Sequence, residues 1–220
     1  MLTAFTASLL LITISELGDK TFFIAVILAM RHPHRTVFAA VFAALALMTV
    51  LSVALGQVMT LFPKIYIHYG EIVLFLVLGL KLLYDASKMS AKSETEIVHE
   101  AEEFIEAQDS PNALASIPVF GKSLRNILAK YSWLRLWLQA FVMTFIAEWG
   151  DRTQISTIAL AASYNPVFVT LGAILGHGIC TAIAVVGGSL IAGRISEQII
   201  TAIGGVLFII FGLAAYFQGV

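Results

Sequence analysis

ISELGDKTFF, residues 14–23, places Glu16, Asp19 and Lys20 inside a long apolar stretch. A second stretch, IAEWGDRTQI at residues 146–155, repeats the pattern 132 residues later. A carboxylate at the centre of a membrane helix costs about 2.5–3.5 kcal/mol on insertion scales. If these stretches lie in a membrane, the charges need a functional reason.

The composition is that of a membrane protein. Of the 220 residues, 59% are hydrophobic and only 12% are charged, whereas soluble domains carry about 25% charged residues. The mean hydropathy is +0.91. A net charge of −1 gives no basic surface for nucleic acid. The expected environment is therefore the lipid bilayer.

Six apolar segments approach the length of about 20 residues that crosses a bilayer, which predicts an all-α integral membrane fold. The segments are residues 3–30, 36–61, 69–84, 136–162, 167–192 and 198–217. Nearly all basic residues between them fall on the side of the central loop, and Lys64 alone falls on the opposite side. Because positive loops stay in the cytoplasm, we expect a cytoplasmic central loop and both termini on the opposite side.

The central loop, residues 85–135, differs from the rest in composition. Ser93 followed by Glu96 forms a capping box, and apolar residues then recur at helical spacing among acids, which predicts an acidic amphipathic helix. A basic segment follows, and its Trp133 and Trp137 are typical of the membrane interface.

The two charged stretches belong to an internal repeat. The matched positions are Glu16 and Glu148, Gly18 and Gly150, Asp19 and Asp151, Lys20 and Arg152, and Thr21 and Thr153. Residues 1–84 and 136–220 would each hold three helices. Because three is odd, the second repeat must cross the membrane in the opposite direction, and inverted repeats of this kind build transporters with a site near the midplane.

The repeated acids are suited to a cation. On a continuous helix, Glu16 and Asp19 would share one face, as would Glu148 and Asp151, so four carboxylates could converge where the repeats meet. Gly18 and Gly150 permit close helix approach or local unwinding. Lys20 and Arg152 would neutralise two of the four negative charges. One divalent cation or two protons would neutralise the other two. Oxygen ligands favour Ca²⁺ or Mn²⁺.

Other interpretations of these residues stay open. Glu16–Lys20 and Glu148–Arg152 have the spacing of structural i,i+4 ion pairs. Gln154 is a candidate amide-oxygen ligand, and His177 is either a proton relay or a packing residue. No cofactor is expected, since the sequence shows no phosphate-binding loop, no thiol or imidazole metal cluster and no nucleophile triad. A transporter is favoured over an intramembrane enzyme, which would not explain the inverted repeat.

The motif Glu-x-Gly-Asp-(Lys/Arg)-(Ser/Thr) resembles the signature of the GDT-type family of Ca²⁺/Mn²⁺:H⁺ antiporters, and most closely its cyanobacterial and plastid-type members. The resemblance covers essentially the whole chain. It implies proton-coupled export of Mn²⁺, Ca²⁺ or both from the cytoplasm, across a bacterial plasma or thylakoid-type membrane. It assigns the cation to Glu16, Asp19, Glu148 and Asp151, with Thr21 and Thr153 as auxiliaries.

A passive divalent-cation channel, with the same acids as a selectivity ring, is the alternative function. Both metals fit the ligand set and neither is preferred. The oligomeric state is left open, a homo-oligomer included.

Overall fold

The computed structural model describes residues 2–89, 131–191 and 197–218, with five helical positions of the central loop, 99, 101–103 and 105. Every regular element in these ranges is an α-helix. The remainder of the predicted acidic helix and the basic segment up to residue 130 lie outside the described residues. The sides of the membrane predicted for the loop and the termini stay predictions.

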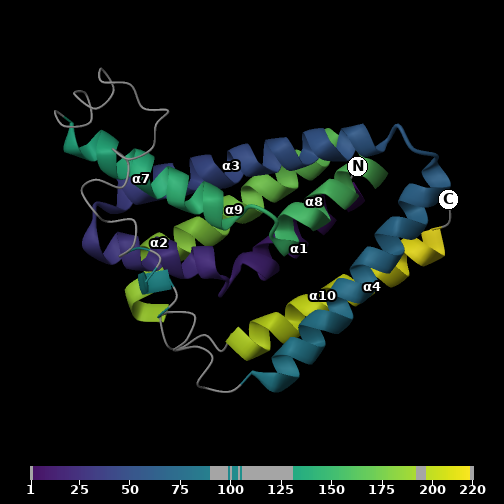
Figure 1. Ribbon diagram of the computed structural model, residues 1–220. Helices are drawn as coiled ribbons and strands as arrows, with labels where there is room; N and C mark the ends of the chain where they lie inside the picture. The colour runs from purple at the N-terminus through teal and green to yellow at the C-terminus, as the bar shows by residue number, and fades with distance from the viewer. Residues whose placement is uncertain are drawn as a thin grey trace.

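The two halves of the chain contain the same succession of helices, two short and two long (Figure 1). The first half holds α1 (Leu2–Glu16), α2 (Lys20–Arg31), α3 (His34–Met59) and α4 (Lys64–Lys88). The second half holds α7 (Ser132–Ala147), α8 (Arg152–Ser163), α9 (Pro166–Ile191) and α10 (Glu197–Gln218).

The expected first and fourth spans are each broken into two helices, so the expectation of continuous helices at residues 3–30 and 136–162 is wrong. The third span is longer than expected, because α4 begins at Lys64 and not at residue 69. Pro63 precedes it with φ −55°, a fixed angle that suits a helix start, and the polar residues that follow continue the helix.

In the described ranges, four helices are long and apolar enough to cross a membrane: α3, α4, α9 over Pro166–Gly187, and α10 over Gln198–Phe217. The helices α1 and α7 are apolar but shorter. These are the four uninterrupted segments among the six expected from the sequence. The chain is thus a multi-pass membrane protein by its helices.

Packing between the halves follows the repeat. The helix α1 packs on α9 and its counterpart α7 packs on α3, while α2 packs on α9 and α8 on α3. The helices α4 and α10 lie side by side as a pair (Figure 1). They approach closely because Gly79 faces Gly205: a Cβ on Gly79 would lie 2.8 Å from the Gly205 carbonyl oxygen. Small residues at such crossings are typical of membrane helices.

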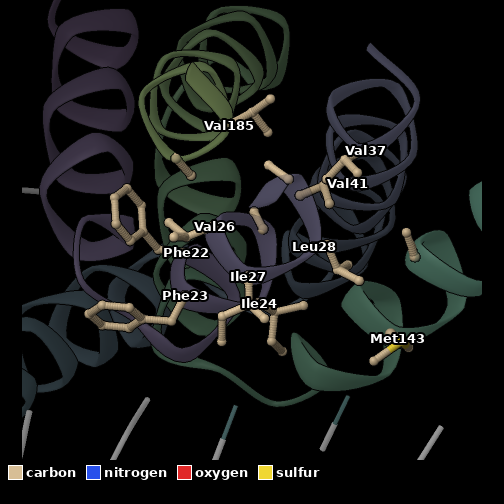
Figure 2. Close-up of a cluster of buried hydrophobic side chains, with 14 of the residues drawn as sticks. Phe22, Phe23, Ile24, Val26, Ile27, Leu28, Val37, Val41, Met143 and Val185 are labelled. Atoms are coloured by element: carbon tan, nitrogen blue, oxygen red, sulfur yellow. The ribbon is translucent and has the colours of Figure 1, made fainter. Parts of the chain in front are cut away.

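The helix α2 is enclosed by protein on all sides. Every residue from 21 to 29 is buried, as in a helix whose whole circumference is apolar. Figure 2 shows its side chains among Val37 and Val41 of α3, Met143 of α7 and Val185 of α9. The short helix that follows the first charged motif is therefore held firmly by three neighbours.

Candidate functional site

Each charged motif forms a tight turn that ends one helix and begins another. The Asp19 amide donates to the Glu16 carbonyl oxygen at 3.2 Å, and Gly18 between them has φ 81°. The second motif repeats this geometry, with the Asp151 amide 3.2 Å from the Glu148 carbonyl oxygen. Left-handed backbone of this kind is accessible to glycine at little cost. Local unwinding, one of the two expected roles of these glycines, is confirmed.

The turns bring helix ends to the centre of the fold. Glu16 is the last residue of α1 and Glu148 follows α7, whereas Asp19 and Asp151 are the N-caps of α2 and α8. The Asp151 carboxylate accepts from the Thr153 amide at 3.2 Å. The helix C-termini, which carry partial negative charge, attract cations. Broken helices place such ends at ion sites in transporters.

Three carboxylates converge from the two repeats. Oxygens of Glu16, Glu148 and Asp151 lie within 4.8 Å of one another, and we call these three residues the carboxylate cluster. The two glutamates are each 2% exposed. Their Oε1 atoms have no hydrogen-bond partner among the described residues, so each offers a free lone pair to a cation or a proton.

The threonines of the motifs hold the other glutamate oxygens. Thr21 Oγ1 lies 3.4 Å from Glu16 Oε2, and Thr153 Oγ1 lies 3.4 Å from Glu148 Oε2. Each hydroxyl also interacts with the glutamate of the other repeat. The two threonines therefore lie beside the carboxylate cluster and connect its two halves, and their role as auxiliaries stays a prediction.

Asp19 lies at the edge of the carboxylate cluster, where Arg152 binds it. The Arg152 Nη2 atom lies 2.9 Å from Asp19 Oδ1, and its Nε lies 3.9 Å from Asp151 Oδ1. The alternative pairing of Arg152 with Glu148 is wrong, since the helix break turns the guanidinium toward the other repeat. Three of the four expected carboxylates have oxygens within 4.8 Å of one another, and Asp19 lies near enough to interact electrostatically with all three. Asp19 as a cation ligand stays a prediction. Lys20, the counterpart of Arg152, is the half-buried first residue of α2.

His177 lies next to the carboxylate cluster, whereas Gln154 binds the backbone of the second turn. His177 is buried on α9, with Nδ1 3.5 Å from Glu16 Oε1, so it adjoins the carboxylate cluster. The Gln154 amide oxygen accepts from the Gly150 amide at 2.7 Å, and its Nε2 donates to Met48 Sδ at 3.2 Å. The oxygen of Gln154 therefore holds the turn in this structure, and its role as an amide-oxygen ligand stays a prediction.

Two cavities lie between the carboxylate cluster and the end of the fold where α2 finishes. One reaches Glu16 and passes Thr21, Thr181 and Ala184. The other, of about 300 Å³, is lined by Val26, Ala29, Met30, His34, Ala184 and Val185. Ala184 of α9 borders both cavities.

Sequence reasoning missed Glu71. It is 4% exposed on α4, and its Oε1 has no hydrogen-bond partner among the described residues. The available signal was an acid within the expected span 69–84. The internal repeat gave no signal for Glu71, because the matching residues of the second half are Ile203 and Gly204, which carry no charge.

The turn geometry predicts the effect of changing Gly150. Alanine there should destabilise the protein by about 1–2 kcal/mol, because an L-residue is disfavoured at positive φ, although a Cβ would meet no atom within 4 Å. Gly70→Ala is the matched control, since its Cβ also meets nothing and its helical backbone favours alanine. Thermal unfolding in detergent measures the stability of both variants. Equal stability would contradict the left-handed backbone conformation of Gly150.

Comparisons with known proteins cover both halves of the chain. The sequence model described as "Divalent cation/proton antiporter GDT1" matches residues 4–90 and 136–220. GDT1-like protein sll0615 of Synechocystis is 52% identical over 98% of both chains. GDT1-like protein 4 of Oryza sativa is 45% identical over 97% of this chain and 73% of its own length. GDT1-like protein 5 of Arabidopsis thaliana is 39% identical over 97% of this chain and 95% of its own length. No solved structure matches the chain.

Both repeats, with their charged turns, fall within the matched segments, and the relatives align over nearly the whole chain. The chain belongs to the GDT1 family of divalent cation/proton antiporters.

Proposed function

We propose that this protein exports Mn²⁺, Ca²⁺ or both from the cytoplasm in exchange for protons, and that the carboxylate cluster is the transport site. The observation that carries the proposal is the pair of buried Oε1 atoms of Glu16 and Glu148, which have no hydrogen-bond partner within the described part of the chain and are brought together with Asp151 from two repeats. Buried acids without partners are costly in a membrane, and a bound cation or proton offsets that cost.

The ligand chemistry supports a hard divalent cation. The cluster supplies carboxylate oxygens beside two threonine hydroxyls, and Ca²⁺ and Mn²⁺ accept oxygen ligands. His177 lies beside Glu16 as a further nitrogen donor, which Mn²⁺ tolerates better than Ca²⁺. Asp19 acts in this proposal through Arg152, whose charge it balances.

Protons use the same oxygens in the other half of the cycle. Protonation of the cluster removes the negative charge that holds the metal, so metal and protons compete for one site. Exchange of two protons for one divalent cation would be electroneutral. Proton entry from the non-cytoplasmic side would then drive metal release there.

We further propose six membrane spans in two inverted repeats, residues 1–84 and 136–220, joined by a cytoplasmic loop at 85–135. The matching succession of helices supports this organisation. The α4–α10 pair packs on α1 and α8. These two short helices lie between the carboxylate cluster and the face where α8 ends. Exchange of the repeats would instead place the pair on α7 and α2. Rocking of the pair between these positions would expose the site alternately.

The cavities beside Ala184 are the proposed route from the loop side to Glu16. Ala184→Phe should slow metal exchange strongly, because the larger ring would fill the junction of the two cavities. Val186→Phe is the matched control on the same helix, since Val186 is 74% exposed. Metal flux into liposomes compares the two, and unimpaired flux in Ala184→Phe would show that the route runs elsewhere.

Metal uptake into proteoliposomes tests the function. Purified protein is reconstituted with an acidic interior and an internal metal-sensitive dye, and Mn²⁺ and Ca²⁺ are compared in parallel. Accumulation above equilibrium that collapses with a protonophore is the expected result, and the two rates rank the metals. Flux that runs only downhill would indicate the alternative function, a passive channel, and would overturn coupled exchange.

A further inference from the structure

A second buried carboxylate lies outside the carboxylate cluster, where α4 meets the end of α8. Glu71 is 4% exposed, and the Ser163 hydroxyl donates to it. Its Oε1 has no hydrogen-bond partner among the described residues. Tyr164 lies near enough for its phenol to interact electrostatically with Glu71. We call Glu71, Ser163 and Tyr164 the α4–α8 polar group.

No ion pair within the described part of the chain compensates the negative charge of Glu71. From α8 the titratable neighbour is Tyr164, and α10, which also packs on α4, has no acidic or basic residue between 198 and 217. His68 lies one turn earlier on α4 itself and is half-buried. A buried acid in this setting is neutralised by taking up a proton.

The α4–α8 polar group is separate from the carboxylate cluster but joined to it by α8. The helix runs from Arg152, beside the cluster, to Ser163, a path of about 16 Å at 1.5 Å per residue. The group lies toward the face where α8 ends, which is non-cytoplasmic in the proposed orientation. Gln57 of α3 donates to the Ala161 carbonyl oxygen at 2.6 Å at the same end, so three helices meet there.

We propose that the α4–α8 polar group is a second proton-binding site, through which protons from this face reach the carboxylate cluster. The proton bonds to Glu71 Oε1, and that bond breaks when water admitted between the separated helices accepts the proton and carries it to a cluster carboxylate. One carboxylate with two hydroxyls suits a proton, because a divalent cation needs more oxygens. The site lies in the contact between α4 and α8, so separation of these helices would expose it to solvent. This inference rests on the proposed function for the direction of proton flow.

Infrared spectroscopy of the reconstituted full chain tests the proton site directly. The C=O stretch of a protonated carboxyl group is followed through a pH titration in wild type, Glu71→Gln and Ser163→Ala. We expect Glu71→Gln to lose one titrating band, and Ser163→Ala to shift the pH at which that band disappears. Glu103→Gln, which removes an exposed carboxylate, is the matched control and should leave the band unchanged. An unchanged band in Glu71→Gln would overturn the proposal.

Exchange measurements on the same variants test the role of the site. In Glu71→Gln we expect metal exchange to lose its dependence on the pH of the non-cytoplasmic side, while stabilisation of the protein by Mn²⁺ is retained. A purely structural Glu71 would lower thermal stability and leave the pH profile intact, which would also overturn the proposal. If wild type shows no coupled exchange, the proposed function fails, whereas the infrared titration still decides whether Glu71 binds a proton.

Discussion

Glu16→Gln should abolish proton-coupled metal exchange while leaving the protein folded. Glu16 is 2% exposed, and its Oε1 lies 3.5 Å from His177 Nδ1 and has no hydrogen-bond partner among the residues that the structure describes. Glutamine has nearly the same shape and still accepts from the Thr21 hydroxyl. It cannot carry a negative charge or release a proton, so both halves of the exchange cycle should fail.

Metal binding gives a second readout for Glu16→Gln. A ligand at a hundredfold excess over its Kd stabilises the folded state by about 2.7 kcal/mol, so wild type should unfold at a higher temperature with Mn²⁺. The variant should lose most of that gain, because one of three clustered carboxylates is gone. Without metal it should be at least as stable as wild type, since a buried carboxylate is costly.

Glu103→Gln removes the same charge from an exposed position in the loop, and it should leave both readouts unchanged. Retained exchange in Glu16→Gln would remove Glu16 from the transport site. Loss of folding, seen as aggregation during size-exclusion chromatography, would instead show that its charge is structural.

The sequence predicted the four long helices of this fold because long apolar segments leave few alternatives in a membrane. It also identified the two motifs, since charges inside such segments stand out. The helix breaks were predictable in part. Glycine after a helix and aspartate before the next are ordinary stop and start signals, and Gly18 and Asp19 place both inside one motif.

The partners of the charged residues could not be predicted from spacing alone. An i,i+4 rule assumes a continuous helix, whereas the turn at Gly150 aims Arg152 at Asp19, 133 positions earlier in the chain. Glu71 was missed for a related reason: its partner Ser163 lies in the other half. Contacts that join repeats depend on how the repeats pack, and no local pattern encodes them.

Arg152→Gln should bind Mn²⁺ at least about tenfold more tightly and exchange it more slowly. Its guanidinium lies 2.9 Å from Asp19 and 3.9 Å from Asp151 of the carboxylate cluster. Two unit charges 4 Å apart interact by about 4 kcal/mol at an effective dielectric of 20. Arg152 is 32% exposed, and solvent weakens its repulsion of the cation. A tenfold change in affinity, however, needs only about 1.4 kcal/mol.

The Asp19→Asn/Arg152→Gln double variant separates charge from contact. Removing both partners restores the net charge of the site, so Mn²⁺ affinity should return toward the wild-type value, as a double-mutant cycle measures. Asp19→Asn alone leaves Arg152 without its 2.9 Å partner and should weaken Mn²⁺ binding, because the freed positive charge then opposes the cation. Isothermal titration gives the four affinities. Equal affinities in the two single variants would mean that the pair holds the repeats together without tuning the cluster. A weakening in Asp19→Asn with a tightening in Arg152→Gln would mean that this cross-repeat pair sets how firmly the metal is held before release.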